Sequence, residues 1–291
     1  MARRWTGLAL AGLALLAGCG PQAVPANPAL WQVEGPGGQR GWLFGTIHAL
    51  PQPVAWQTPK VRAALEASDR LVLEIAAVGD DAATARAFES LAHTAGQVPI
   101  DQKLPENLRP QLARLLSKGR LVPERFADLE SWAAAIVLAQ AAQADAGGNS
   151  AWGVDRALVK EAKTRPVSEL EGAAAQLALF DTLPEPSQRF MLAEVVAGAD
   201  RAGADMRQLA EGWRRGDVAA LARQTREGML ADPNLREALF TGRNRRWSGA
   251  IAVMMAKGAK PFVAVGAAHM AGPDGLPAML AARGFRVTRV Q

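Results

Sequence analysis

The sequence predicts an α+β fold with an α/β-like pattern, in which a helical middle segment packs around a central mixed β-sheet. An apolar, strand-like run ends in Gly45-Thr46-Ile47-His48, and a second one ends in Gly266-Ala267-Ala268-His269. Each of these sequences is followed by a helical pattern and a further strand, so both chain ends carry a strand–Gly-x-x-His–helix–strand unit. Between the units, apolar residues recur mainly at helical spacing, which predicts helices there.

The first unit is predicted to be a hairpin followed by a β-α-β crossover. The sequence Gly35-Pro36-Gly37-Gly38 is typical of a turn and separates the two hairpin strands. The second hairpin strand leads to His48, and the strand after the crossover helix is apolar except for Glu74. The predicted elements are strands at 30–33 and 41–44, a helix at 59–68 and a strand at 71–75.

The remaining elements follow from the same two periodicities. In the middle of the chain we predict helices at 82–95, between 106 and 144, at 154–163 and across 173–257, with one strand at 166–170. The second unit comprises a strand at 261–265, a helix at 276–283 and a last strand at 285–290.

The first residues predict an export signal. Residues 1–18 have a basic start and an apolar run at 8–17 that is too short to span a bilayer. The following Leu16-Ala17-Gly18-Cys19 resembles the lipobox of bacterial lipoproteins, in which the cysteine carries the lipid. We therefore expect a membrane anchor at Cys19, and Gly20 after it favours the outer membrane, facing the periplasm. The alternative is an ordinary secretory peptide in which the cysteine is accidental.

Composition limits the remaining possibilities. The sequence of 291 residues contains one cysteine, which excludes an internal disulfide and a cysteine metal site. Its net charge of +5 is mild, so a nucleic-acid partner is not expected. We predict a Pro/Gly/Ala-rich tether at 19–29 and one domain at 30–291, and we interpret the arginine clusters beside Trp213 and Trp247 as solvated helix faces.

Chain connectivity predicts where the polar side chains meet. A β-α-β crossover usually makes its two strands parallel, so their carboxyl ends lie at one edge of the sheet. His48 and Glu74 are therefore expected at the same edge, where open α/β sheets bind their ligands. His269 and Glu171 also follow predicted strands and are expected there. We interpret the glycine three residues before each histidine as allowing a tight backbone turn.

Two histidines and a carboxylate form a nitrogen–oxygen ligand set that suits Zn, Mn, Co or Fe(II). Such a metal acidifies a bound water, and a further carboxylate acts as general base. Each histidine alone is also explained as a helix cap or a hydrogen-bonded core residue. Glu74 needs a partner if it is buried, and an arginine would satisfy it as a metal would. The third histidine, His93, is expected at the surface.

The same residues resemble the TraB/GumN family, also called TraB/PrgY/GumN, over nearly the whole chain from about Leu30. The matching segments are Leu43-Phe44-Gly45-Thr46-Ile47-His48, Leu71-Val72-Leu73-Glu74, Gly153-Val154-Asp155, Leu170-Glu171, Gln176, Arg243-Asn244, Trp247 and Val263-Ala264-Val265-Gly266-Ala267-Ala268-His269-Met270. One departure is Glu74-Ile75-Ala76, where family members often have Glu-Leu-Asp.

This family is similar to the Tiki proteins, which are membrane-tethered metalloproteases. The resemblance implies a hydrolytic site that depends on a divalent metal (Mn, Co or Zn) held by His48, Glu74, His269 and Glu171. It implies Arg243 and Asn244 as supporting residues of the catalytic set. We therefore expect a lipid-anchored, peptidase-like hydrolase with a peptide or protein substrate. The alternatives are a haem-binding or a peptide-binding lipoprotein without catalysis.

Overall fold

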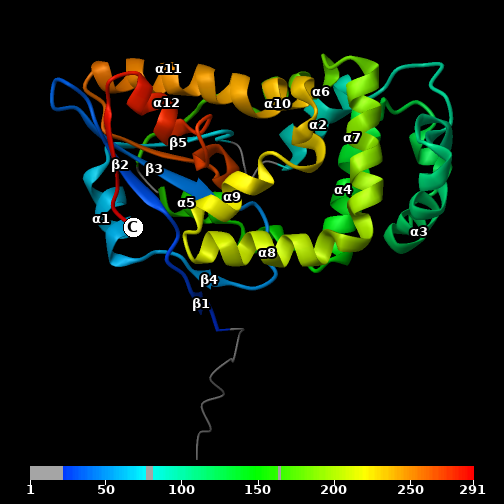
Figure 1. The fold of residues 1–291 in the computed structure, drawn as a ribbon, viewed down its shortest axis with the longest axis horizontal. Helices are drawn as coiled ribbons and strands as arrows, with labels where there is room; N and C mark the ends of the chain where they lie inside the picture. The colour runs from blue at the N-terminus through cyan, green and yellow to red at the C-terminus, as the bar shows by residue number, and fades with distance from the viewer. Residues whose placement is uncertain (1–21, 77–80, 163–164) are drawn as a thin grey trace, which may run out of the picture.

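The structure is a computed structural model and describes residues 22–76, 81–162 and 165–291. Its core is a mixed six-stranded sheet with the strand order β6-β5-β7-β3-β2-β8, which confirms the predicted α+β class (Figure 1). The strands are β2 (Leu30–Glu34), β3 (Arg40–Thr46), β5 (Arg70–Leu73), β6 (Val167–Glu169), β7 (Pro261–Gly266) and β8 (Arg286–Arg289). The predicted signal and Cys19 lie outside the described residues.

The end of the expected tether is in contact with the domain. Residues Val24–Pro25 form strand β1, which pairs in parallel with β4 (Val54–Ala55) in a separate two-stranded sheet. No helix in the described parts of the chain has the length and apolar character needed to cross a bilayer.

The two strands that lead to Gly-x-x-His sequences are direct neighbours. β3 pairs in parallel with β7, with Gly45 opposite Val265 and Thr46 opposite Gly266. The two motifs are thus offset by one residue, and because side chains alternate along a strand, their glycines face opposite sides of the sheet. β7 also pairs in parallel with β5, so the predicted crossover from β3 to β5 passes over β7. The carboxyl ends of all three strands still share one edge.

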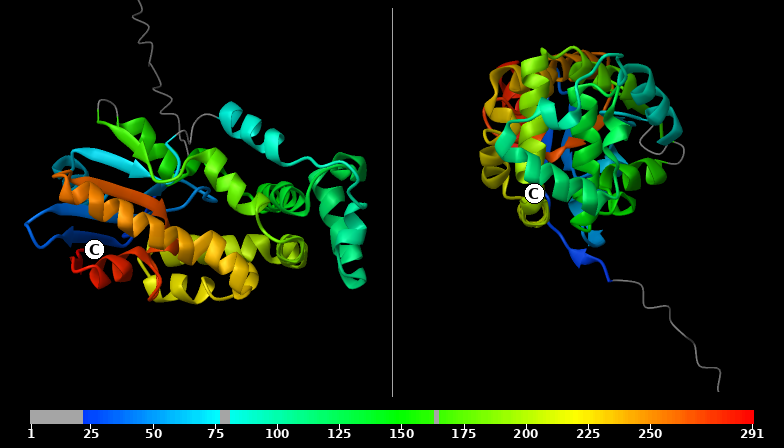
Figure 2. Two further views of the ribbon diagram at one scale, coloured as in Figure 1. Left: turned by 90° about the horizontal axis from the view of Figure 1, so that it is seen from above. Right: turned by 90° about the vertical axis from the view of Figure 1, so that its right-hand side faces the viewer.

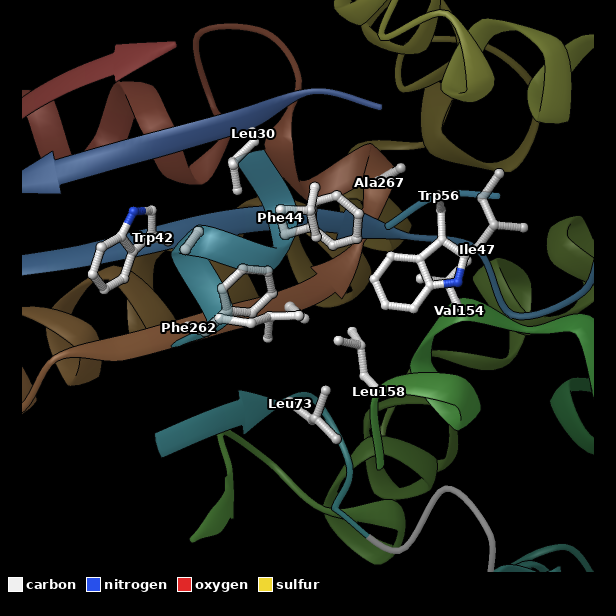
Figure 3. Close-up of a cluster of buried hydrophobic side chains, with 14 of the residues drawn as sticks. Leu30, Trp42, Phe44, Ile47, Trp56, Leu73, Val154, Leu158, Phe262 and Ala267 are labelled. Carbon is white, nitrogen blue, oxygen red and sulfur yellow. The ribbon is translucent and has the colours of Figure 1, made fainter. Parts of the chain in front are cut away.

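Each face of the sheet has its own apolar layer. On one face, Phe44 and Phe262 pack with a 5.7 Å ring separation against the helices α1 (Pro59–Ala67) and α5 (Val154–Ala162) (Figure 3). On the other face, strand residues such as Val263 pack against α11 (Gly242–Ala256) and α12 (Leu276–Ala282). The side chains on both faces of these strands are therefore buried, as expected for a sheet that is covered by helices on both sides.

One part of the helical middle segment, built around α3, α4 and α7 (Arg109–Gly119, Ser131–Asp145 and Glu185–Gly198), lies beyond the carboxyl ends of the parallel strands and has a hydrophobic core of its own (Figures 1 and 2). The arrow of β3 points toward it, and the long helices α8 (Ala202–Arg214) and α11 extend from the sheet into it. Its position makes it a lid over the predicted functional edge. The other helices are α2 (Asp81–Leu91), α6 (Ala173–Asp181), α9 (Val218–Gln224) and α10 (Pro233–Arg236).

Candidate functional site

Glu74 directly follows β5, and both of its carboxylate oxygens are hydrogen-bonded. Oε1 accepts the Gly266 N–H at 2.6 Å, and Oε2 accepts Arg243 Nη2 at 2.7 Å and Gln176 Nε2 at 3.2 Å. Burial would raise the pKa of Glu74, but the charge that His269 gains in acid, the charges of Arg243 and His48 and the Gly266 hydrogen bond lower it to about 2. The carboxylate is therefore ionised at neutral pH. The partner that a buried glutamate requires is an arginine.

Arg243 lies at the centre of the site. Its Nη2 is 2.7 Å from Glu74 Oε2 and 2.8 Å from Glu171 Oε2, and its Nε donates to Glu171 at 3.0 Å. Its Nη1 donates to the Leu239 carbonyl at 3.3 Å, and the guanidinium lies over the ring of Trp247, 4.4 Å from the centroid. These partners satisfy the planar donor fork of arginine almost completely.

The interpretation of this arginine cluster as a solvated helix face is wrong for three of its members. Arg243, Asn244 and Trp247 are buried, while Arg245 and Arg246 are exposed. The chain enters α11 through a π-helical turn at Glu237–Thr241, a local widening that is frequent at functional sites. The sequence of the cluster does not show that Arg243 pairs with two buried carboxylates, Glu74 and Glu171, which follow the neighbouring strands β5 and β6.

His269 lies in a short 3₁₀ turn, Ala267–Met270, and its neighbours determine which ring nitrogen carries the proton. Asn244 Nδ2 donates to the Asp274 carbonyl at 2.7 Å, so its Oδ1 is free to accept His269 Nδ1–H at 2.7 Å. The lone pair of His269 Nε2 then faces Arg243 Nη1 at 3.3 Å. Burial lowers the pKa of His269 to about 4, so the imidazole is neutral at neutral pH.

His48 occupies the matching place after β3 in the opposite environment. Its side chain is 66% exposed, and its Nδ1 lies 2.8 Å from Oδ2 of Asp155, whose side chain is buried. This hydrogen bond is the main reason why the pKa of His48 is raised to about 9, with the charges of Asp155 and Glu74 adding to it against partial burial. His48 is therefore an imidazolium at neutral pH.

Asp155 is held against His48 by the start of α5. The Val154 N–H donates to the Ile47 carbonyl at 2.9 Å, which ties the first turn of the helix to the His48 loop. A Cβ at Gly153 would overlap the His48 carbonyl oxygen, so only glycine permits this approach. The Asp155 carboxylate thereby orients the imidazole and leaves its Nε2 toward the cavity.

Three of the predicted site residues, His48, Glu74 and His269, converge on Gly266. A Cβ built on this glycine would lie 3.2 Å from Glu74 Oε1, 3.9 Å from His48 Nε2 and 3.7 Å from His269 Cδ2. Gly266 has φ −46° and ψ 134°, a conformation open to any residue, so the expectation that it serves a tight turn is wrong. The glycine leaves space among the three side chains. Gly45 is likewise a matter of space, because its Cβ would approach the Ala267 Cα to 2.9 Å.

Two adjoining cavities of about 380 and 360 Å³ meet at this point. Their shared lining is Thr46, His48, Glu74 and Gln176. One cavity extends over Asp155 toward α4, and the other extends over Arg243 and His269 toward α8. The charged groups therefore lie in the middle of a cleft between the sheet and the helical lid, which is the arrangement typical of ligand sites.

The expected metal ligands do not fit a metal as they are arranged. Glu74, Glu171 and His269 all direct their lone pairs at the guanidinium of Arg243. Within the described residues, no group of three or more histidine, aspartate or glutamate side chains is arranged to hold a metal ion. A haem iron would also find both ring nitrogens of His269 engaged. The metal and the roles of the individual residues stay predictions.

Two residues of the site, Asp155 and Gln176, match the family, but the sequence predicts no role for them. Asp155 lies in the first turn of α5, where acidic residues are common, and only the fold shows that it is buried beside His48. Gln176 reaches Glu74 from α6 across 102 positions of sequence, and no periodicity indicates that contact. His93 is near the surface, as predicted, and bonds Glu89 and Asp128.

Comparison with known proteins gives a consistent result. Residues 29–289 match the model of the TraB/PrgY/gumN family, which confirms the resemblance predicted from the paired motifs. The chain is 27% identical over 253 residues to the uncharacterized protein YbaP of Shigella flexneri, covering 84% of this chain and 89% of that protein. The uncharacterized protein YbaP of Escherichia coli K12 is similar to the same extent. No solved structure matches the chain.

Proposed function

The chain belongs to the TraB/PrgY/gumN family, and on this premise we propose that it is a hydrolase that cleaves peptide-like carbonyl bonds at the Glu74–His48 cleft. The observation that carries the proposal is a pair of oppositely charged groups at one cavity, each oriented by a buried partner. Asp155 orients His48, and Arg243 orients Glu74. A site with this arrangement resembles the acid–base pairs of hydrolases.

The protonation states support a role for each of these residues. His48 is protonated at neutral pH, so its Nε2–H is the proton donor to the leaving group or to the carbonyl oxygen. Glu74 is ionised, and its carboxylate orients the attacking water and accepts the proton that the water loses as it attacks the carbonyl. His269 stays neutral and holds Arg243 against Glu74, which makes it a positioning residue.

The lining of the cleft supports a peptide-like substrate. Amide side chains of Gln140, Gln143 and Gln176 border the two cavities and match the donors and acceptors of a polypeptide backbone. Apolar residues such as Met206 and Leu209 complete the second cavity.

We further propose that Cys19 carries a lipid that anchors the domain to the outer membrane on its periplasmic side. Mass spectrometry of the N-terminal peptide, with Cys19→Ser as control, tests that anchor.

Hydrolysis of a fluorogenic ester and of a quenched peptide pool by the purified protein tests the proposal. We expect Glu74→Gln and His48→Gln to lower the rate by about 10²-fold or more, since each removes one half of the acid–base pair. His93→Gln, at the surface, is the matched control and should leave the rate unchanged. Peptide binding without turnover in the wild type would instead favour the non-catalytic, peptide-binding alternative.

A further inference from the structure

We propose that Arg243 is a built-in cation that takes the place of a divalent metal, and that removing its guanidinium opens a site for Mn²⁺ or Zn²⁺. Three side chains of the types that bind such ions direct lone pairs at it. Two are the carboxylates of Glu74 and Glu171, at 2.7 and 2.8 Å from Nη2, and the third is Nε2 of His269, at 3.3 Å from Nη1. Carboxylate and neutral imidazole together form a ligand set suited to these metals.

Burial makes a cation at this point obligatory. The side chains of Arg243, Glu74 and Glu171 are only 8, 9 and 7% exposed. Two buried carboxylates without a positive partner would be strongly unfavourable. Of the two carboxylates, Arg246 pairs with that of Glu171, at 3.4 Å, and its own side chain is 55% exposed. The guanidinium is thus the main charge that balances the cluster.

The three ligand-type residues are held in place without Arg243. His269 is fixed by Asn244 and lies between the rings of Phe240 and Trp247, at 5.4 and 4.6 Å. Glu74 keeps the hydrogen bond from the Gly266 N–H. The ligands are therefore preorganised, so a metal ion would meet them close to their present positions.

Glu171 is also held independently of the guanidinium. Its backbone N–H donates to the Glu74 carbonyl at 3.2 Å, and its second carboxylate oxygen contacts Arg246. The two carboxylates therefore stay adjacent when the guanidinium is removed. Their repulsion then favours a divalent ion over an empty space.

The test compares the wild type with Arg243→Ala, Arg243→Lys and Arg243→Ala/His269→Ala. Metal content after purification, isothermal titration with MnCl₂ and ZnCl₂, and the melting temperature are measured. We expect no metal in the wild type or in Arg243→Lys, because both retain the cation. Arg243→Ala should bind one ion per chain and melt at a higher temperature with metal than with chelator. Loss of His269 from this variant should weaken binding by about tenfold or more.

Stoichiometric metal in the wild type that His269→Ala or Glu171→Gln removes would overturn the proposal, as would an Arg243→Ala protein that takes up none. If Arg243→Ala is unfolded without metal, circular dichroism should show that Mn²⁺ or Zn²⁺ restores its helices, and failure to do so counts equally against it. The proposal concerns the site of the proposed function, but its readouts are metal content and stability. Failure of this metal proposal can therefore be distinguished from failure of the proposed hydrolytic function.

Discussion

His48 and His269 come from the same short sequence pattern and have opposite electrostatics. His48 protrudes into the cleft, and its hydrogen bond with the Asp155 carboxylate raises its pKa to about 9. His269 is buried between aromatic rings, with its Nδ1–H given to Asn244, and burial lowers its pKa to about 4. Under the proposed function, this separation of the two pKa values makes His48 the proton donor and His269 a neutral positioning group.

Asp155→Asn tests the cause of the high pKa of His48. Without the carboxylate, that pKa should fall from about 9 toward the ordinary value of 6.5, because its largest contribution is removed. NMR titration of the imidazole signals measures this directly, and the sequence contains only three histidines. The His93 signal, which has its own partners, should stay unchanged and serves as the internal control. An unaltered His48 titration would rule out Asp155 as the cause.

Gly266→Ala tests the space at the centre of the site. Its methyl group would lie 3.2 Å from Glu74 Oε1, closer than side chains normally allow, while the backbone conformation accepts alanine. We expect the hydrolytic rate to fall by about 10²-fold, because the carboxylate is displaced, with a stability change of at most about 1 kcal/mol. Rate and urea unfolding are both measured. Gly198→Ala, where a Cβ meets nothing within 4 Å, is the control. Equal rates for both variants would contradict the crowding argument.

At the scale of elements, α11 is the helix that builds the buried half of the site. Its first turn presents Arg243 and Asn244 in succession, and Trp247 follows one turn later beneath both the guanidinium and His269. A π-helical turn at Glu237–Thr241 directly precedes the helix. Because α11 supplies the Arg243 cation, the Asn244 amide and the Trp247 ring to one point, substitutions in these residues should change both the stability of the fold and the geometry of the site.

Asn244→Ala should therefore cost stability. The substitution leaves His269 Nδ1 and the Asp274 carbonyl without their partner in a buried place, which we expect to lower the free energy of unfolding by about 1–3 kcal/mol. Urea denaturation measures the change. The neighbouring Arg245→Ala removes only an exposed ion pair with Glu237 and should cost at most about 1 kcal/mol. Similar losses for the two variants would show that the amide is not a structural link.

The sequence predicted most strands and the edge at which they deliver polar residues, because these depend on local periodicity and connectivity. It did not predict that β7 lies between β3 and β5, since strand order depends on long-range packing. It also did not predict that Arg243 is buried or that Asp155 meets His48 across 107 positions. Both features depend on segments that are distant in sequence, and a charged residue on a helix is usually exposed to solvent.

At the scale of the whole molecule, the site couples folding to pH. His269 is neutral in the folded protein down to about pH 4, whereas an unfolded histidine binds a proton below about pH 6.5. Glu74 stays ionised to about pH 2, whereas an unfolded glutamate is protonated below about pH 4.5. In both cases the unfolded chain binds more protons, so both contributions to stability are lost as the pH falls.

The free energy of unfolding should therefore decline in two steps on acidification, and the first step belongs to His269. Between pH 6.5 and 4 we expect a loss of at most about 3 kcal/mol, from the displacement of the pKa from 6.5 to about 4. His269→Asn should be less stable at pH 7 and nearly insensitive over this window, while His93→Ala should keep the wild-type slope. Urea unfolding at half-unit pH steps measures the slopes. A His269→Asn protein that declines as steeply as the wild type would assign the acid sensitivity to groups outside the cleft.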